Sequence, residues 1–298
     1  MQKQIIIMTM NNIRKNYEVG RLVEEVEKAE IPFMWAKYSD MVIEANNENP
    51  KVFIKGQEIN SDNTYSIWFR VAGTKTGKYP IGRALMLRIL RMKGVDCVNT
   101  TAYSTWERMG KISQHGVFVE NEIPVIPTRI FYKKSQVLEY DFKYPLICKH
   151  DRGFQGRSVR KFDNRSEMQK WLTKMDEIKL GMFVWQDYLP LKWDLRVIVI
   201  GGKMLGAMRR SALGDEFRSN FSLGGAVEAW SLDEKDKVIA EKVAKVCGLD
   251  YCGVDIMKDE VGNSYVLEVN RQCQFQGFEK STGTNVAKAV VDLMTKSS

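Results

Sequence analysis

The sequence predicts a mixed α/β protein, with an N-terminal α/β domain followed by two α+β subdomains. Up to about residue 102, short apolar runs typical of strands alternate with amphipathic runs typical of helices. From about residue 143 the order becomes strand, glycine loop, strand, helix and strand. From about residue 189, hairpins precede a helix, two strands and a last helix. We therefore divide the chain into residues 1–102, 103–188 and 189–298.

Individual elements follow from the same patterns. Residues 5–8 form a predicted strand, and residues 22–29 an amphipathic helix, because their apolar side chains recur every three or four positions. Further strands are expected near residue 33 and at 52–54 and 66–69, and a second helix at 81–92. Later in the chain we expect a helix ending near His115, a strand over 123–130, and helices over 234–246 and 286–294.

The composition excludes several classes of protein. No apolar run approaches the roughly 18 residues that cross a membrane, and no secretory signal pattern opens the chain, so we expect a cytoplasmic protein without a membrane partner. Five scattered cysteines indicate reduced thiols, and two histidines disfavour a zinc site or a histidine-dependent triad. The net charge of +8 fits either a nucleic-acid partner or a basic surface around an anionic ligand.

An acidic pattern at the end of the chain predicts a metal site. Residues 264–270 alternate like a strand, which places Glu268 and Asn270 on one face together with Val266. Asp255 lies on the preceding strand and shares that face if it pairs with Val266 or Glu268, whereas a one-residue slip reverses it. Two close carboxylates and an amide are hard oxygen ligands that suit Mg2+. The alternative is a set of solvated polar positions on a hairpin.

Other segments provide groups that suit a nucleotide. Lys149 ends an apolar strand and runs into a glycine loop, which can fold backbone N–H groups over phosphates or be an ordinary turn. A second apolar strand turns polar at Gln186, Asp187 and Tyr188. Asp194 and Arg196 share one strand face, either as an ion pair or as nucleotide contacts. Arginines follow at positions 209, 210 and 218, and arginine binds phosphoryl groups well.

Taken in order, these segments resemble the ATP-grasp superfamily and most closely its RimK-like ligases. The resemblance covers roughly residues 80–296. Five segments carry it: Trp193-Asp194-Leu195-Arg196, Phe217-Arg218-Ser219-Asn220 with Gly224-Gly225, Gly253-Val254-Asp255-Ile256, Glu268-Val269-Asn270, and residues 277–283. Each segment alone is weak evidence, but five in order at fitting distances make a specific match.

The resemblance implies a role for each matching residue. Asp255, Glu268 and Asn270 would ligate two Mg2+ ions, with Mn2+ as an alternative ion. Arg210 and Arg218 would act in catalysis, Arg210 by stabilising charge on an acyl phosphate. The ATP-binding residues would be Lys111, Lys149, Gly153, Phe154, Gln155, Gly156, Arg157, Ser158, Gln186, Asp187, Tyr188, Asp194, Ser219 and Asn220. Among them, Gln186, Asp187 and Tyr188 would hold the adenine.

Two departures from the family pattern concern the acceptor. Residues 271–275 read Arg-Gln-Cys-Gln-Phe where the family often has Ala-Ser-Pro-Gly, and Ser211 replaces a further arginine. Lys111 aligns only with a one-residue insertion. The segment 271–275 lies beside the acceptor site in the family, so the acceptor is expected to differ here.

The implied reaction is ATP-dependent joining of a carboxylate to an amine through an acyl phosphate, with release of ADP and phosphate. The partners would be ATP, a carboxylate on a peptide, protein or cofactor, and an amino acid such as glutamate or another amine. Two alternatives remain at this stage: an RNA- or ribosome-binding protein with a vestigial ATP-grasp fold, and an ATP-grasp kinase. A homo-oligomer is one arrangement that the sequence allows.

Overall fold

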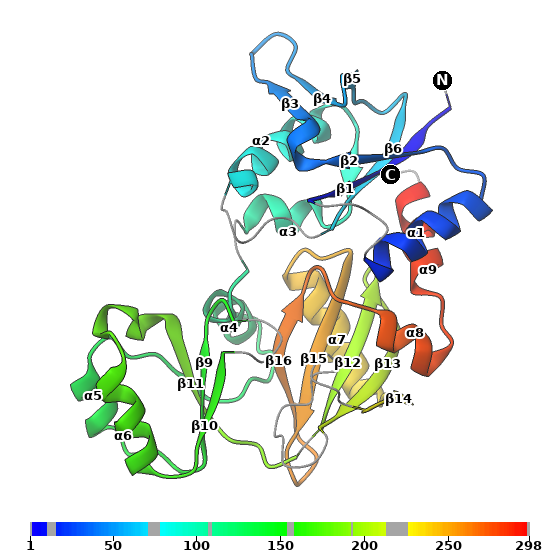
Figure 1. Ribbon diagram of the computed structural model, residues 1–298. Coiled ribbons are helices and arrows are strands. Elements are labelled where there is room, and N and C mark those ends of the chain that lie inside the picture. Colours follow the sequence, from blue (N-terminus) through cyan, green and yellow to red (C-terminus); the bar gives the residue numbers. More distant parts are fainter. Residues whose placement is uncertain are drawn as a thin grey trace.

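The computed structural model describes residues 2–10, 16–70, 78–106, 109–153, 158–191, 193–212 and 226–296. Within these ranges the strands form four sheets, two in the N-terminal part and one in each of the following parts (Figure 1).

The first sheet is parallel and has the strand order β2-β1-β6-β7. Its strands are β1 (Gln4–Thr9), β2 (Phe33–Lys37), β6 (Thr64–Phe69) and β7 (Asp96–Cys97). Both faces of β1 are buried, because Ile5 and Ile7 belong to one core cluster while Ile6 and Met8 belong to another. A parallel sheet covered on both faces explains why β1 is a continuous apolar run.

Helices and a small sheet surround this first sheet. They are α1 (Tyr17–Lys28), η2 (Tyr38–Asp40), β3 (Met41–Glu44), β4 (Lys51–Ile54), β5 (Gln57–Glu58), α2 (Lys78–Met92) and α3 (Thr100–Thr105). The side chain of Asn16 caps α1 by accepting a hydrogen bond from the Val19 N–H at 3.2 Å. The helices predicted at 22–29 and 81–92 are confirmed, although both begin earlier.

The second part contains α4 (Lys111–Glu120) and an antiparallel sheet of order β10-β9-β11-β8. Its remaining elements are β8 (Thr128–Arg129), α5 (Lys134–Glu139), β9 (Leu146–His150), β10 (Val159–Phe162), α6 (Arg165–Lys174), η3 (Glu177–Met182) and β11 (Phe183–Asp187). The predicted helix end near His115 is wrong. The helix continues through Gly116, which has open space around its Cα, and is capped by Asn121.

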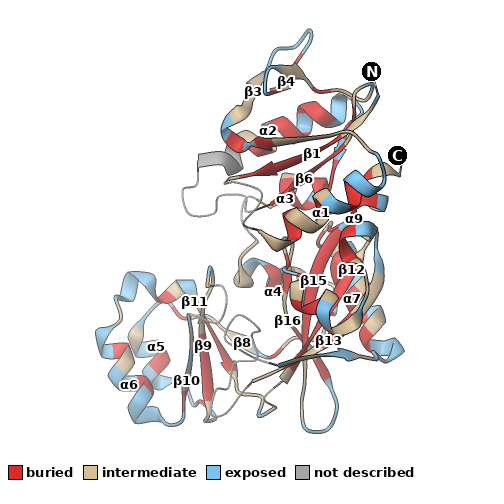
Figure 2. Cartoon of the chain, turned by 45° about the vertical axis from the view of Figure 1, so that its right-hand side comes forward, coloured by how far each residue is buried: buried red, intermediate tan, exposed pale blue. Residues whose placement is uncertain are grey.

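The third part is a five-stranded antiparallel sheet of order β14-β13-β12-β15-β16. Its elements are β12 (Trp193–Ile200), β13 (Lys203–Ser211), β14 (Ala226–Trp230), α7 (Glu234–Val246), β15 (Tyr251–Lys258), β16 (Ser264–Asn270), α8 (Gln276–Thr282) and α9 (Val286–Thr295). Helix α7 covers one face, where Val243 packs in a cluster with Val197 and Val254. Figure 2 shows the resulting burial of β12 and β15.

One core cluster joins the first sheet to the last part of the chain. Ile5 and Trp68 share this cluster with Tyr251, Phe278 and Val290. Helix α9 therefore returns to pack against α1 and β6, as Figure 1 shows for α1 and α9. The boundaries drawn after residues 102 and 188 remain a prediction. None of the helices in the described ranges is both long and apolar enough to cross a membrane.

Phe278→Ala tests this shared core. Phe278 is fully buried and its ring lies 3.0 Å from the position that a Cβ on Gly206 would occupy. Its truncation should lower the free energy of unfolding by about 3–5 kcal/mol because it leaves a cavity. Denaturant titration measures this. Val261→Ala, at a residue that is 84% exposed, should change stability by less than about 0.5 kcal/mol. Equal effects of the two changes would contradict the core assignment.

Candidate functional site

The acidic strand pair has the register that a shared site requires. Asp255 of β15 lies directly opposite Glu268 of β16, which confirms one of the two pairings expected from the sequence. The register then shifts, leaving Leu267 as the extra residue of a β-bulge. The bulge makes the expected position of Val266 wrong, because Val266 is buried together with Val269 beneath α7. The bulge thus changes the alternation of the strand just before Glu268.

Asp255 is held by two arginines from neighbouring strands. Arg196 of β12 forms a two-pronged contact, through Nε and through Nη2 at 2.8 Å, and Arg210 of β13 donates from Nη2 at 3.0 Å. Arg210 also binds both carboxylate oxygens of Asp194, at 2.6 and 2.9 Å. Burial alone would raise the pKa of Asp255, but the two guanidiniums hold that pKa below its usual range. The sequence predicts Asp194 and Arg196 on one strand face. In the structure each forms an ion pair with a residue of a neighbouring strand, Asp194 with Arg210 and Arg196 with Asp255.

Glu268 is held by a lysine from the helix before the second sheet. Lys111 Nζ lies 2.9 Å from Glu268 Oε2, and Asn270 Nδ2 donates to Oε1 at 3.1 Å. The Lys111 ammonium also donates to the carbonyl of Gly153 at 2.8 Å. Burial raises the pKa of Glu268, but Lys111 is the largest opposing influence and the net shift is downward. Lys111 therefore connects the acidic pair to the start of the glycine loop.

Lys149 provides a second ammonium in this region. Burial and the nearby Lys111 ammonium lower its pKa to about 8, while the charges of Glu268, Asp194 and Asp255 act in the opposite direction. Four cationic side chains thus meet three carboxylates here: Lys111, Lys149, Arg196 and Arg210 against Asp194, Asp255 and Glu268. This excess of positive charge suits an anionic ligand.

Two residues of α4 that the sequence did not single out position the site. Gln114 forms hydrogen bonds with both backbone groups of Val269: its Oε1 accepts from the N–H at 2.8 Å and its Nε2 donates to the carbonyl at 3.1 Å. His115 Nδ1 lies 2.8 Å from the Lys111 carbonyl, so it carries the proton, and burial lowers the pKa of this imidazole. Gln114 and His115 follow Lys111 by three and four residues, and this spacing in the sequence indicates that the three side chains share one face of the helix.

The three residues expected to hold adenine lie at the end of β11 and differ in their surroundings. Gln186 is buried, its Nε2 lies 3.0 Å from His115 Nε2, and no described residue forms a hydrogen bond with its Oε1. Asp187 accepts a hydrogen bond from Arg129 at 2.9 Å. The ring of Tyr188 lies 4.9 Å from a lysine ammonium, that of residue 161. Gln186 therefore has the one unsatisfied buried acceptor among these three side chains, all of which the structure describes.

The ends of the glycine loop lie close together beside Lys111. The N–H of His150 donates to the carbonyl of Ser158 at 3.1 Å, and a Cβ on Gly153 would lie 2.8 Å from Ser158 Cβ. The side chain of Asp151 accepts from the Ile112 N–H at 2.9 Å and so caps α4. The remaining predicted residues lie outside the described ranges: Phe154, Gln155, Gly156, Arg157, Arg218, Ser219 and Asn220.

The segment after Asn270 is held from the N-terminal part. Arg70 Nη1 donates to the carbonyls of Gln272 and Cys273 at 2.7 and 3.0 Å, and its Nη2 pairs with Glu18 at 2.9 Å. Glu18 also accepts a hydrogen bond from the Phe275 N–H at 3.3 Å. The segment that departs from the family pattern is therefore fixed by a buried ion pair between two residues of the N-terminal part.

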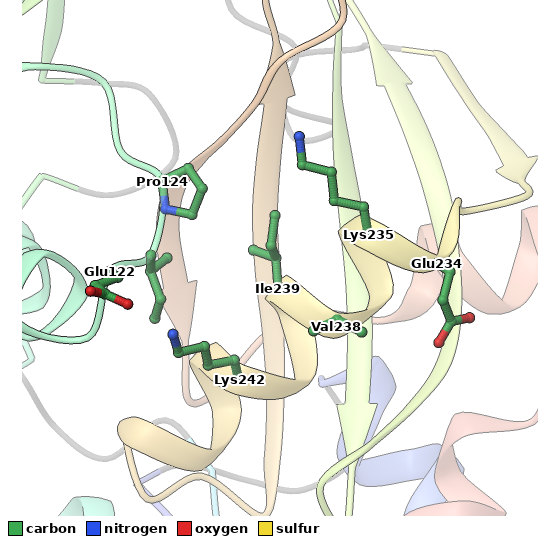
Figure 3. A pocket seen from close by; sticks show the side chains of 8 residues that line it. Glu122, Pro124, Glu234, Lys235, Val238, Ile239 and Lys242 are labelled. Carbon is green, nitrogen blue, oxygen red and sulfur yellow. The ribbon is translucent and has the colours of Figure 1, made fainter.

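A surface groove of about 400 Å³ lies elsewhere, between α7 and residues 122–124 (Figure 3). It is lined by Val238, Lys235 and Lys242 of α7 among others, and by none of the predicted site residues. It lies on the α7 side of the sheet, so the cluster around Asp255 is a separate feature.

Comparisons with known proteins agree with this arrangement. The RimK-like ATP-grasp domain family matches residues 109–294. A protein of Aliivibrio fischeri (strain MJ11) named probable alpha-L-glutamate ligase is 30% identical over 94% of this chain and 92% of its own length. A protein of the same name from Methanococcoides burtonii (strain DSM 6242) is 26% identical over 98% of this chain and 95% of its own length.

Solved structures share the fold along the whole chain. The ATP-grasp ligase PsnB complexed with a minimal precursor superposes with a TM-score of 0.77 at 18% identity, covering 99% of this chain and 98% of that one. A RiPP-associated ATP-grasp ligase of Chryseobacterium gregarium, in complex with ADP and a leader and core peptide, gives 0.75 at 13% identity, covering 100% and 98%.

Gly253→Ala tests the packing beneath Asp255. A Cβ at Gly253 would lie 2.8 Å from both Arg196 Cδ and Cys273 Cβ, so the arginine must move away from its carboxylate partner. We expect a loss of about 1–3 kcal/mol in the free energy of unfolding, measured by denaturant titration. Gly20→Ala in α1 has open space and should stabilise by up to about 1 kcal/mol. A neutral Gly253 variant would show that Arg196 is not held in place.

Proposed function

Because the chain belongs to the RimK-like ATP-grasp family, we propose that it is an ATP-dependent carboxylate–amine ligase that works through an acyl phosphate and releases ADP and phosphate. The fold class and the family predicted from the sequence are confirmed, and with them an ATP-dependent carbon–nitrogen ligase at the level of the family. The observation that carries the proposal is the cluster of Lys111, Lys149, Arg196 and Arg210 around three carboxylates.

The donor atoms of the acidic pair fit Mg2+. Asp255 and Glu268 are paired across two strands, and the amide of Asn270 lies next to Glu268, so two carboxylates and an amide meet at one place. The proposed site thus has two carboxylates rather than three. In the part of the chain that the structure describes, no group of three or more His, Cys, Asp or Glu side chains could hold a metal ion. Mg2+ suits such a site because it takes few protein carboxylates and completes its shell with phosphate oxygens and water. A structure of PsnB contains Mg and ADP, which supports this ion.

We propose the following roles for the remaining residues. Lys111 and Lys149 neutralise phosphate charge, Gln186 offers its unsatisfied Oε1 to the adenine amino group, and Arg210 stabilises the acyl phosphate. Asp187, Tyr188 and Asp194 would complete the nucleotide contacts, as would the glycine loop from Gly153 to Ser158. Arg218, Ser219 and Asn220 would lie beside the phosphates. The number of metal ions, Mn2+ as an alternative, a cytoplasmic location and a homo-oligomer remain predictions.

The chemistry needs charge neutralisation and positioning rather than a protein nucleophile. A carboxylate oxygen attacks the γ-phosphorus, and the bond to ADP breaks. The amine nitrogen then attacks the acyl carbon, phosphate leaves, and the amine loses a proton. All five cysteines lie in the described part and are buried, and burial raises the pKa of each thiol, as expected if none acts as a nucleophile.

The substrates proposed are an amino acid such as glutamate and a carboxylate on a peptide, protein or cofactor. The relatives' name supports glutamate, and the peptide complexes of PsnB and the Chryseobacterium ligase support a peptide. A screen for ADP release over amino acids paired with candidate carboxylates identifies the pair.

Glu268→Gln tests the proposed site. With a productive pair, the wild type should release ADP only when ATP, carboxylate and amine are all present. The variant should lose at least about a hundredfold in kcat, because it removes a charge that positions Lys111 and the proposed Mg2+. Glu260→Gln, an exposed position on the same hairpin, should keep full activity. Full activity of Glu268→Gln would refute the site, and a stable phosphorylated product without any amine would indicate a kinase.

The pKa of Lys149 predicts a pH dependence of nucleotide binding. Only the protonated ammonium attracts phosphate, so affinity for an ATP analogue with Mg2+ should fall as pH rises through about 8. At pH 9 about one tenth of Lys149 remains protonated, which predicts about tenfold weaker binding than at pH 7. Calorimetric titration measures this. Lys149→Arg should bind with little change between pH 7 and 9, and an unchanged pH dependence in that variant would assign the effect to another group.

The stability of the unliganded protein should change in the opposite direction. A lysine whose pKa is lowered by folding from 10.5 to about 8 holds fewer protons in the folded chain than in the unfolded chain between these pH values. Stability therefore rises with pH in that window. The two opposite trends separate a ligand effect from a folding effect.

A further inference from the structure

Arg83 of α2 is buried, and no acidic side chain among the described residues is paired with it. Its side chain is 1% exposed, and within the described ranges neither Nε nor Nη2 has a hydrogen-bond partner. The contact that the structure does give it is with the ring of Tyr103, whose centroid lies 4.3 Å from the guanidinium carbon. A buried charge without a partner costs stability, so a protein keeps one mainly where a ligand uses it.

The other buried arginines of the described chain make the contrast clear. Arg70 lies 2.9 Å from a Glu18 oxygen, Arg196 lies 2.8 Å from an Asp255 oxygen, and Arg210 lies 2.6 Å from an Asp194 oxygen. Within the same ranges, Nε and Nη2 of Arg83 have no hydrogen-bond partner. Among the buried arginines of the described chain, Arg83 is thus the exception to this pairing.

Further polar groups lie around the same tyrosine. The guanidinium carbon of Arg271 lies 4.5 Å from the Tyr103 centroid, and Gln272 Nε2 donates to the Tyr103 hydroxyl at 2.6 Å. Arg271 and Gln272 are only half-buried, whereas Arg83 lies beneath the surface. Two guanidiniums near one aromatic ring form a basic site with a partly open side.

This basic site adjoins the proposed reaction centre in the sequence. Arg271 directly follows Asn270 at the end of β16, so their Cα atoms are about 3.8 Å apart. Figure 1 shows the end of β16 directed at α3, the helix that carries Tyr103. Arg70 fixes the carbonyls of Gln272 and Cys273 from the other side. Because the guanidinium carbons of Arg83 and Arg271 lie 4.3 and 4.5 Å from the same ring, Arg83 lies beside the segment that continues directly from the proposed centre.

We propose that Arg83, assisted by Arg271 and Gln272, binds a carboxylate of the amine substrate that does not itself react. The amine substrate would then be a free amino acid, anchored by its acid group, rather than a simple amine or a lysine side chain within a peptide. The planar fork of arginine binds carboxylates in pairs of hydrogen bonds, which fits the two unsatisfied nitrogens. This inference rests on the proposed ligase function and adds the location and chemistry of its acceptor site.

A binding experiment tests the site without turnover. The probes are L-glutamate and glutarate, followed by thermal unfolding of the wild type and of Arg83→Gln and Arg83→Lys. Both probes should raise the Tm of the wild type and leave that of Arg83→Gln unchanged, with Arg83→Lys in between. Without ligand, Arg83→Gln should be as stable as the wild type or more stable, because it removes an unpaired buried charge. Arg88→Gln, at an exposed arginine of the same helix, should behave as the wild type.

A kinetic experiment separates this site from the ligase proposal. With a productive amino acid, Arg83→Gln should raise KM for the amine at least about tenfold and leave KM for ATP unchanged, since a charge-assisted hydrogen bond is lost. Glutamine and isoglutamine, each of which replaces one carboxylate of glutamate by an amide, identify the carboxylate that is anchored. The compound that lacks the anchored carboxylate should bind the wild type and Arg83→Gln equally weakly.

Three results would overturn the anchor: no ligand-induced rise in Tm for the wild type, an equal rise in Arg83→Gln, or an unchanged KM for the amine. A wild type that releases no amine-dependent ADP would instead refute the ligase function, and the thermal measurement would still decide whether Arg83 binds a carboxylate.

Discussion

The buried ion pairs of Arg196 and Arg210 with Asp255 and Asp194 are the interaction on which the rest of the proposed site depends. Asp255 lies in the middle of a sheet and is 3% exposed, so its charge requires partners from the neighbouring strands. Strand pairing supplies them, because Arg196 is the direct partner of Asp255 in β12 and Arg210 that of Asp194 in β13. The same two arginines would also limit how much of Asp255 is free to meet a metal ion. A metal ion bound with the nucleotide and the two arginines would therefore share the negative charge of Asp255.

Much of the fold was predictable because it depends on local patterns. The helix predicted over 234–246 has those bounds in the structure, since its apolar period is regular and Asp233 caps its first turn. The site was harder. Direct pairing of Asp255 with Glu268 was one of several registers that the hairpin allowed. The bulge at Leu267, which turns Val266 into the core, has no signal in the sequence beyond ordinary apolar residues.

Contacts between distant segments could not be predicted from one sequence. Lys111 was expected near phosphates, and the structure places its ammonium between Glu268 and Gly153. Gln114 holds β16 from a helix about 150 positions earlier, which only the tertiary structure shows. Arg70 likewise reaches Gln272 across the two ends of the chain. The N-terminal part of the chain therefore contributes to the acceptor side of the proposed site, in addition to packing against α9.

The acyl phosphate pathway is tested most directly by following the oxygen atoms of the carboxylate. With a carboxylate substrate labelled with 18O, ATP and a productive amino acid, an acyl phosphate pathway transfers one labelled oxygen to each phosphate released. Mass spectrometry of the inorganic phosphate measures this transfer. The acyl phosphate pathway predicts one 18O per phosphate, in proportion to the amide formed. Unlabelled phosphate, released with or without formation of the amide, would contradict it.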